Sequence, residues 1–445
     1  MVRVITYGTF DLFHEGHRRL LERAKALGDH LIVGVTSEGY DDGRGKLNVR
    51  QSLVERIHNV TESGLADEVI VEEYDGQKVS DIQRHGVDVF AIGSDWTGRF
   101  DYLSDHCEVV YLERTRGVSS TQLRAAGRVI RMGVIGAGRI AGRFVKEARF
   151  VSGISVEAVW TRDPAKAAAF AGEFELQWAN ETLDEMLQHV DAVYIATPHE
   201  THVPYARRAM EAGVHVLCEK PLALAPEEAE ALFTLADERN LIVLEALKTA
   251  FSPGFQRMVA IARSGTIGSI RSVNATFTKL VAEGRELDPP VGGAISELAS
   301  YPLLAIIKLL GDQPSSVQSR TYRPEGSAVD LFARIDVDYP HAIATATVGL
   351  GVKAEGSLVV AGTLGYLYVP APWWLTEYFE TRFEDPRNNR KYYYKFDGDG
   401  LRYELAEFVG MISEGSRESF KLRRADSLAI ASLIHEARTQ PRLFS

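Results

Sequence analysis

Short apolar runs alternate with amphipathic segments along the first part of the chain, and each run has the length of a strand. The segments around residues 18–27, 53–63 and 79–85 have helical periodicity, and we expect Gly28 to end the first of these helices. Strands that alternate with helices predict a parallel sheet covered on both faces. The expected strands are Val2–Tyr7, Leu31–Val35, Glu68–Val71, Val89–Ile92 and Glu108–Leu112.

The same alternation begins again near residue 130. Residues 121–128 have the pattern of a helix and Val129–Ile135 that of a strand. No segment rich in Gly, Ser or Pro separates the two series, so we expect a short junction. Further strands of this second βαβ series are expected at Val156–Trp160, Ala192–Ala196, Val214–Cys218 and Ile242–Glu245.

Beyond residue 250 the apolar positions alternate or are β-branched, which predicts a largely antiparallel sheet. The segments are Ser272–Lys279, Phe332–Tyr339, Ala342–Leu350 and Gly356–Ala361. The predicted fold class is α/β, with two successive Rossmann-like parallel-sheet domains over residues 1–130 and 131–248. An α+β domain with the antiparallel sheet is expected over residues 249–445.

Composition narrows the functional classes. With 445 residues, 45% apolar and 25% charged, the chain is long enough for several cores and ordinary enough to fold throughout. A net charge of −11 argues against a nucleic-acid partner. Cys107 and Cys218 lack metal-ligand spacing, so we expect neither a disulfide nor a metal site. Without a signal-peptide core or an apolar run of about 18 residues, we expect a cytoplasmic protein without a membrane partner.

Two histidines lie three residues apart in Tyr7-Gly-Thr-Phe-Asp-Leu-Phe-His14-Glu-Gly-His17, where a strand turns into a helix. The free amides and dipole of a helix N-terminus favour phosphate, and two imidazoles there can donate to a triphosphate. Gly8 and Gly16 would let the backbone approach closely. By its spacing alone, such a pair is more often an ordinary pair of surface or core residues.

The wider string resembles the HxGH signature of the nucleotidyltransferase superfamily, and in particular the glycerol-3-phosphate cytidylyltransferases. Gly93–Asp101, Cys107–Leu112 and residues 114–121 match at the family's spacing, so the resemblance covers nearly all of residues 1–128. It implies that His14 and His17 stabilise the α-phosphate of CTP and the leaving pyrophosphate, with Mg²⁺ bound to the nucleotide. The other residues that it implies for CTP or the acceptor are Thr9, Phe10, Asp11, Asp95, Trp96, Arg114, Ser119 and Thr121.

A basic loop expected by the same resemblance departs from the family's spacing. Lys46 and Arg50 provide its cations and are assigned to CTP or acceptor binding, although a solvated loop is the alternative. Because the departure falls near the expected acceptor site, the identity of the acceptor stays open.

A dinucleotide-binding pattern, Gly136-Ala-Gly138-Arg139-Ile140-Ala141, follows the first strand of the second series. Gly136 would make the tight turn, Gly138 would admit the pyrophosphate, and Arg139 and Ile140 would open the helix beside it. After the next strand come Thr161-Arg162-Asp163. Arg162 favours the 2′-phosphate of NADP(H), whereas Asp163 keeps NAD(H) open.

Two further segments, Ile195–His202 and Val216–Leu222, resemble the glucose–fructose oxidoreductase and inositol dehydrogenase family. The resemblance covers residues 131 to about 370. It implies that Lys220 lies beside the nicotinamide and polarises the substrate oxygen. The cofactor-binding residues assigned from these segments are Thr197, Pro198, His199, His202 and Glu219.

The segment Gly292–Tyr301 resembles the family's substrate segment. Tyr301 would donate the proton, with its pKa lowered by Lys220, and Glu297 would orient substrate from the same helical face. A half-buried helix tyrosine is the structural alternative for Tyr301.

Ala250 replaces an arginine of related proteins, so substrate recognition must differ. Lys248 is assigned to an anionic group of the substrate, with a helix-surface salt bridge as the alternative.

Together these resemblances predict a bifunctional enzyme. NADPH-dependent reduction of a ketose phosphate would give an alditol phosphate, and cytidylyl transfer from CTP would convert it into a CDP-alditol. The alternatives are a transferase fused to an unrelated sugar or polyol dehydrogenase, or to a non-catalytic NADP-binding module. Both families also imply a homodimer or higher homo-oligomer.

Overall fold

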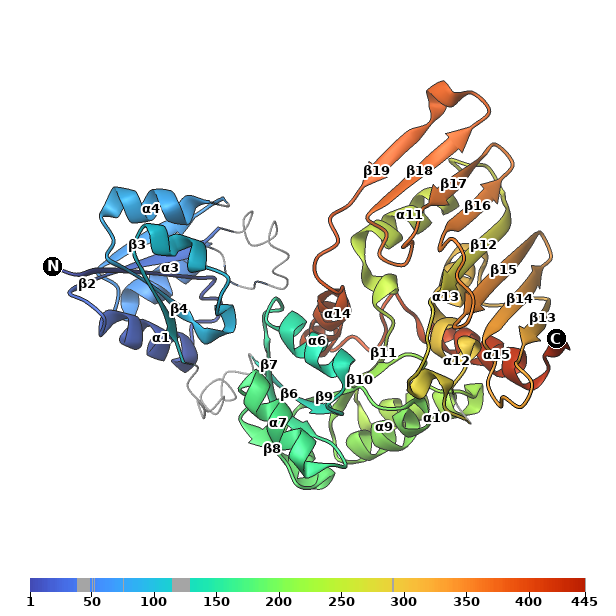
Figure 1. Cartoon of the computed structure of the whole chain (residues 1–445), viewed down its shortest axis with the longest axis horizontal. Coiled ribbons are helices and arrows are strands. Elements are labelled where there is room, and N and C mark those ends of the chain that lie inside the picture. Colours follow the sequence, from blue (N-terminus) through green and yellow to red (C-terminus); the bar gives the residue numbers. More distant parts are fainter. Residues whose placement is uncertain are drawn as a thin grey trace. The chain divides into compact units, whose positions relative to one another are not determined.

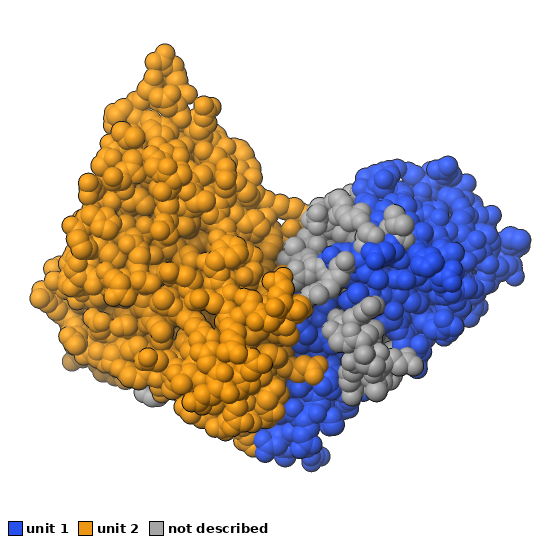
Figure 2. All heavy atoms as spheres, turned by 180° about the vertical axis from the view of Figure 1, so that it is seen from behind, with its two compact units in different colours: residues 1–132, 145–190 blue, residues 133–144, 191–445 orange. Residues whose placement is uncertain are grey.

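The computed structural model describes residues 1–37, 49, 51, 53–74, 76–113, 129–289 and 292–444, and their strands form three sheets (Figure 1). Two compact units are distinguished in Figure 2, one of residues 1–132 and 145–190 and the other of residues 133–144 and 191–445. The three domains expected from the sequence divide the chain differently, and their boundaries stay a prediction. Within the described ranges, no helix is long and apolar enough to cross a membrane.

The first sheet has the strand order β3-β2-β1-β4-β5, and its paired strands are parallel, as predicted. Its central strand β1 is buried along Val4–Tyr7 apart from its ends, which explains the apolar run. The strands are β1 (Arg3–Gly8), β2 (His30–Thr36), β3 (Glu68–Glu72), β4 (Val89–Gly93) and β5 (Glu108–Leu112). The helices are α1 (Glu15–Lys25), α3 (Leu53–Glu62) and α4 (Gln77–His85).

Helix α1 differs at both ends from the helix expected over residues 18–27. It begins at Glu15 because the His14 side chain caps its first amides. It ends at Lys25, where Ala26 takes the cap position in a right-handed conformation, so the expectation that Gly28 ends this helix is wrong. Gly28 is instead required for packing, because a Cβ there would lie 2.6 Å from the Val2 carbonyl oxygen.

The second sheet has the order β11-β10-β9-β6-β7-β8. The first strand of this series, β6, lies between β9 and β7, and in such sheets ligands bind at the carboxyl ends of the strands where the order reverses. The strands are β6 (Ile130–Ile135), β7 (Ile154–Trp160), β8 (Trp178–Ala179), β9 (Ala192–Ile195), β10 (His215–Glu219) and β11 (Val243–Ala246). The helices are α6 (Arg139–Ala148), α7 (Pro164–Phe174), α8 (Leu183–His189), α9 (His202–Glu211) and α10 (Pro226–Arg239).

The third sheet has the order β19-β18-β17-β16-β12-β15-β14-β13-β20. The pairs β12·β15 and β13·β20 are parallel and the other pairs are antiparallel, which confirms the predicted largely antiparallel sheet. The strands are β12 (Ile270–Thr278), β13 (Ser316–Tyr322), β14 (Phe332–Tyr339), β15 (Ala342–Gly349), β16 (Leu358–Gly362), β17 (Gly365–Val369), β18 (Tyr378–Phe383), β19 (Arg390–Tyr393) and β20 (Arg442–Phe444). The helices that follow β11 are α11 (Pro253–Arg263), α12 (Ala294–Leu298), α13 (Ser300–Leu310), α14 (Leu401–Glu414) and α15 (Arg424–Thr439).

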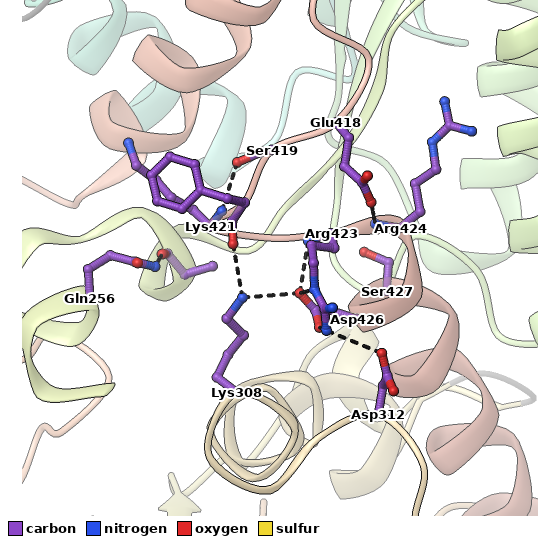
Figure 3. A network of polar contacts seen from close by, with 12 residues as sticks. Gln256, Lys308, Asp312, Glu418, Ser419, Lys421, Arg423, Arg424, Asp426 and Ser427 are labelled. Carbon is purple, nitrogen blue, oxygen red and sulfur yellow. Dashed lines mark hydrogen bonds and ion pairs between the residues drawn. The ribbon is translucent and has the colours of Figure 1, made fainter. Parts of the chain in front are cut away.

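A buried carboxylate joins α13 to α15, the helices that lie beside this sheet (Figures 1 and 3). Asp426, whose side chain is fully buried, accepts from the Lys308 ammonium at 3.1 Å and from the Arg423 guanidinium at 2.7 Å. Arg423 also reaches Asp312 at 3.2 Å. Burial alone raises the pKa of Asp426, but these hydrogen bonds outweigh it and lower that pKa.

Candidate active sites

The transferase loop is organised by His14, which is the N-cap of α1. Its Nδ1 accepts from the amides of Gly16 at 3.0 Å and His17 at 3.4 Å, so a neutral ring has its hydrogen on Nε2. These two amides of the helix N-terminus are therefore engaged by the His14 side chain. The helix dipole remains, and His17 stacks on His14 with ring centroids 3.8 Å apart.

Backbone strain and aromatic packing fix the His17 ring. Phe10 is buried in a left-handed conformation, with φ of +52°, and its ring lies 5.3 Å from His17 edge to face. The two glycines leave room for these side chains. A Cβ at Gly8 would lie 3.0 Å from the Phe10 ring, and one at Gly16 would lie 2.8 Å from Cε1 of His14.

A fully buried arginine, which sequence analysis missed, holds the strand-to-helix loop. Arg56 donates to the carbonyl oxygens of Thr9 at 2.9 Å and Thr36 at 2.7 Å. Asp11 is also buried, and its carboxylate accepts from the Gln51 amide at 2.9 Å. In this structure Asp11 therefore serves the loop's own folding as well as bordering the cavity described next.

A cavity of about 320 Å³ opens at the carboxyl ends of β1 and β4, and its lining includes Thr9, His14, His17 and Trp96. Lys78 also lines it and was not found from the sequence. This lysine is buried beside Glu72, with which it forms an ion pair, and its Nζ lies 4.5 Å from the centroid of the Tyr7 ring. In sequence it looks like a surface cation of α4, and only the fold places it in the cavity.

The remaining transferase assignments cannot be placed. Asp95 lies in a short 3₁₀ turn, Ser94–Trp96, but its side chain is not among the described groups. The other five residues lie outside the described residues: Lys46, Arg50, Arg114, Ser119 and Thr121.

The turn between β6 and α6 fits a pyrophosphate. Gly136 has a φ of +106°, and a Cβ there would lie 2.5 Å from the Ala196 carbonyl oxygen. At Gly138 a Cβ would meet no described atom within 4 Å, so the approach to the N-terminus of α6 is open. Arg139 and Ile140 begin that helix, and Ala141 is fully buried behind them, as the dinucleotide pattern predicts.

Asp163 and Arg162, which follow β7, have different surroundings. Asp163 is the N-cap of α7 and its Oδ1 accepts from the amides of Ala165 at 3.1 Å and Lys166 at 3.3 Å. Arg162, which follows Thr161, is exposed. The carboxylate that could have bound a ribose hydroxyl is thus used to cap a helix, while the neighbouring guanidinium faces solvent.

Lys220 and Glu297, which are far apart in sequence, meet in the second unit. The Lys220 ammonium donates to the Glu297 carbonyl oxygen at 3.1 Å. The Glu297 carboxylate lies 3.5 Å from Nε2 of His199 and 3.8 Å from the Arg285 guanidinium, whose side chain is 50% exposed. Sequence analysis missed Arg285, because it lies outside the family segments and only the fold brings it to Glu297.

Tyr301, the tyrosine expected to donate the proton, has a raised pKa. Burial raises the pKa of Tyr301, and the negative charges of Glu219 and Glu404 raise it further. The expectation that Lys220 lowers this pKa is therefore wrong in this structure. Tyr301 keeps its proton at neutral pH, as a proton donor requires. Glu219 itself accepts from the Tyr194 hydroxyl at 2.5 Å, and burial raises the pKa of Glu219 although Lys220 opposes the change.

Glu297 and Tyr301 do not share one helix. Ala299 separates α12, which includes Glu297, from α13, which begins at Ser300. Ala299 nevertheless keeps a right-handed helical conformation, and its amide donates to the Ile295 carbonyl oxygen at 3.1 Å, so the shared face expected for Glu297 and Tyr301 stays a prediction. The Tyr301 ring packs edge to face on Phe277 of β12 at 5.2 Å, so its position depends on the third sheet.

His202 joins the two loops that border the cofactor site. It is fully buried, with Nδ1 2.8 Å from the Pro221 carbonyl oxygen and Nε2 3.0 Å from that of Thr197. Burial lowers the pKa of His202 to about 4, against the opposing effect of the two carbonyls. It is neutral at pH 7 and donates to one carbonyl at a time. Burial also lowers the pKa of His199, whose ring makes no hydrogen bond to the described residues.

Lys248 lies in a short 3₁₀ turn, Lys248–Phe251, and is partly buried. Its ammonium donates to the Asp399 carbonyl oxygen at 2.6 Å rather than to a carboxylate. Burial lowers its pKa, and the charges of Glu404 and Asp399 oppose the change. In this structure Lys248 therefore fastens the segment before α14.

Models of known protein families match three parts of the chain. The cytidylyltransferase-like family model matches residues 5–159. The model for the oxidoreductase family with an NAD-binding Rossmann fold matches residues 130–247, and that for the GFO/IDH/MocA C-terminal domain matches residues 255–368.

Individual relatives match each part over nearly their whole length. A glycerol-3-phosphate cytidylyltransferase of Bacillus spizizenii is 51% identical over 124 residues, which are 28% of this chain and 95% of that protein. A trans-1,2-dihydrobenzene-1,2-diol dehydrogenase of Danio rerio is 26% identical over 324 residues, 70% of this chain and 96% of that protein. A 3-ketoreductase of Actinomadura kijaniata, solved with NADP and TDP-benzene, is 26% identical, with a TM-score of 0.65 over 71% of this chain and 100% of its own. The chain thus belongs to the cytidylyltransferase family through its N-terminal domain, and the remainder consists of oxidoreductase domains of the GFO/IDH/MocA family.

Proposed function

We propose that this chain makes a CDP-alditol in two steps, the reduction of a ketose phosphate and the transfer of a cytidylyl group to the product. One observation supports most directly a link between the reduction and the cytidylyl transfer. A transferase domain that resembles enzymes acting on glycerol 3-phosphate shares one chain with a site in which Lys220 and a protonated Tyr301 could polarise and protonate a carbonyl that NADPH reduces. The reduction would produce the kind of polyol phosphate that the transferase consumes.

In the reductive step, NADPH, when bound, would supply the hydride for the ketose carbonyl carbon. Tyr301 donates its proton to the carbonyl oxygen as the C=O bond becomes an alcohol, and a solvent proton restores it. Lys220 stabilises the negative charge that develops on that oxygen. Ketose phosphate, NADPH and one proton thus give alditol phosphate and NADP⁺.

In the transfer step, a phosphate oxygen of the alditol phosphate attacks the α-phosphorus of CTP, and the bond to pyrophosphate breaks. His14, with its hydrogen on Nε2, and His17 donate to the oxygens that gain charge. We place Lys78 at the acceptor phosphate because it lines the same cavity. Mg²⁺ would accompany CTP, since this cation prefers phosphate oxygens and water to a dedicated protein cage.

We assign the cofactor as NADP(H). Asp163 is occupied as a helix cap, and Arg162 is exposed after β7, where a 2′-phosphate would bind. The similar 3-ketoreductase was solved with NADP. For the substrate phosphate we favour Arg285 over Lys248, because Arg285 is half exposed beside Glu297 whereas Lys248 is bonded to Asp399.

A second order of steps has its own support. The similar 3-ketoreductase was solved with a TDP compound beside NADP, which favours a nucleotide-linked substrate for the reductase. In that order, the transferase would first couple the ketose phosphate to CMP, and the CDP-linked ketose would then be reduced.

A coupled assay tests both orders. Purified full chain is mixed with CTP, Mg²⁺ and a panel of ketose phosphates, and pyrophosphate release and NADPH loss are followed together with and without each cosubstrate. If pyrophosphate release requires NADPH, reduction comes first; if NADPH loss requires CTP, transfer comes first. Tyr301→Phe and His17→Ala serve as controls that disable one step each. If a ready-made alditol phosphate releases pyrophosphate while no ketose phosphate consumes NADPH, with or without CTP, the linked pathway is wrong.

A further inference from the structure

A second cavity of about 400 Å³ lies in the unit of residues 133–144 and 191–445, apart from Lys220 and Tyr301. Four segments line it: the residues just before α10, the start of α12, the end of β13 with the loop that follows it, and the last turn of α15 with the residues after it. Its lining residues are Leu224, Ala225, Gly292, Ile295, Thr321, Arg323, Ala328, Asp330, His435, Ala437, Arg438, Thr439 and Pro441. Its volume is in the range of small-molecule sites.

Among the described residues that line this cavity, two arginines and one carboxylate are found. Arg323 and Arg438 both act electrostatically on the Asp330 carboxylate. That carboxylate is already engaged, because it accepts from the Ile295 amide at 3.0 Å. Burial lowers the pKa of Arg438, as expected when a guanidinium is removed from water. An anion in the cavity would balance this charge.

Two buried polar atoms in the lining also make no hydrogen bond to a described residue. Thr321 is 1% exposed, and its hydroxyl makes no hydrogen bond to any described residue. The Nε of Arg323 is likewise buried without an acceptor among the described residues. A buried polar group without a partner costs about 1–3 kcal/mol, so such groups are normally satisfied by a ligand or water.

We propose that this cavity binds a small molecule bearing a phosphate group. Guanidinium groups match phosphate oxygens in a two-pronged arrangement, and a hydroxyl such as that of Thr321 adds a donor. The dipole of α15 favours cations in its last turn, and this effect alone explains why an arginine stands at position 438. It does not account for Arg323, which lies in a different segment, or for the buried hydroxyl of Thr321.

The site lies behind the segment that positions Glu297. The Asp330 carbonyl oxygen accepts from the Ala294 amide at 2.8 Å, and its carboxylate holds Ile295, so Asp330 fixes the first turn of α12. An occupant that pairs with both arginines would withdraw their charge from Asp330. The site therefore differs from the substrate site but contacts the helix that includes Glu297.

Isothermal titration calorimetry on the full chain tests the proposal, with NADP⁺ saturating and glycerol 3-phosphate, inorganic phosphate and malonate as probes. The double variant Arg323→Gln, Arg438→Gln is compared with Arg334→Gln, an exposed arginine of β14. We expect a saturable phosphate site in the wild type and in Arg334→Gln that the double variant loses or binds at least tenfold more weakly. Phosphate binding at the two active sites is common to all three proteins and cancels in the comparison.

Thr321→Val covers the case in which the double variant does not fold. It removes only the buried hydroxyl and should weaken the same site several-fold. Tighter binding of glycerol 3-phosphate than of inorganic phosphate would assign the site to a phosphorylated metabolite, and the reverse would assign it to free phosphate. Identical isotherms for wild type and variants, or binding of malonate in preference to both phosphates, would overturn the proposal.

Discussion

The two active sites of this chain are built in opposite ways. In the candidate transferase site, the two histidines assigned to catalysis come from one strand-to-helix loop, where His14 caps its own helix and His17 stacks on it. In the candidate reductase site, Lys220, which follows β10, meets Glu297 of a helix far along the chain, and Tyr301 packs on Phe277 of β12. A local motif therefore defines the first geometry, whereas tertiary packing defines the second.

The two sites also differ in what determines the protonation states of their side chains. In the reductase site burial shifts several titratable groups, raising the pKa of Tyr301 and Glu219 and lowering that of His202. The protonation state that catalysis needs is thus a product of the folded environment. In the transferase loop the tautomer of His14 follows from two hydrogen bonds to backbone amides within its own helix. We infer that a substitution within the strand-to-helix loop should disable the transferase site. The reductase site should also depend on substitutions that weaken packing between distant elements.

The largest effect is expected for His17→Ala. Removing a donor to the charge that develops in phosphoryl transfer should lower CTP-dependent pyrophosphate release about 10³-fold, or about 4 kcal/mol. If reduction precedes transfer, NADPH oxidation by the same sample should be unchanged. The control is His106→Ala, an exposed histidine of the same domain. If both variants retain wild-type pyrophosphate release, the histidine pair is not the transferase centre.

Tyr301→Phe should lower NADPH oxidation about 10²-fold, because the carbonyl oxygen loses its proton donor. Its raised pKa means that Tyr301 stays protonated throughout the neutral range and loses its proton only above the usual tyrosine value of about 10. Wild-type reduction should therefore show no loss from Tyr301 between about pH 7 and 10. Tyr393→Phe, at an exposed tyrosine, is the control. A Phe variant with full reductase activity would remove Tyr301 from the mechanism.

The sequence predicted the three sheets because their strands have distinct patterns. Buried parallel strands such as β1 are continuous apolar runs, and β14 alternates between buried and more exposed positions. The strands β13 and β17–β20 were not predicted. Several are short or largely exposed, as in β19, so their apolar residues do not follow the pattern of a covered face.

For the sites, the sequence predicted residues that lie in a motif and missed those placed by the fold. Lys78 and Arg56 look like helix-surface cations, and only burial against Glu72 and against backbone carbonyls reveals their roles. The pKa of Tyr301 was predicted in the wrong direction for the same reason. The sequence shows Lys220 in a motif but does not show that Glu404 lies close enough to act on Tyr301.

Asp426→Asn tests the dependence of the reductase site on packing. Lys308 and Tyr301 lie on the same helix α13, so the buried Asp426 carboxylate helps to hold Tyr301 in place through Lys308. Losing its charge should reduce the free energy of unfolding by about 2 kcal/mol, measured from the urea midpoint, with little effect on pyrophosphate release. Asp385→Asn, at an exposed pair with Arg387, is the control.

The pH dependence of stability tests the sign of the contribution that Asp426 makes to the free energy of unfolding. Its pKa is lowered in the folded protein, so its contribution is present above the unfolded value of about 3.9 and is lost as the pH falls through the folded value. The difference between wild type and Asp426→Asn should be constant from about pH 6 to 8 and shrink below about pH 4. A difference that grows on acidification would contradict the assigned role of this carboxylate.

The smallest effect is expected for Arg162→Ala, which tests whether a local residue outside the catalytic centre selects the cofactor. An exposed guanidinium paired with the 2′-phosphate should contribute about 1.4 kcal/mol, so the KM for NADPH should rise about tenfold while that for NADH stays the same. Lys166→Ala, a nearby exposed cation, should change neither value. Because Asp163 is occupied in capping α7, removing Arg162 should not by itself create a good NAD site. Equal losses with both cofactors would show that Arg162 supports the fold of this turn rather than the choice between NADP and NAD.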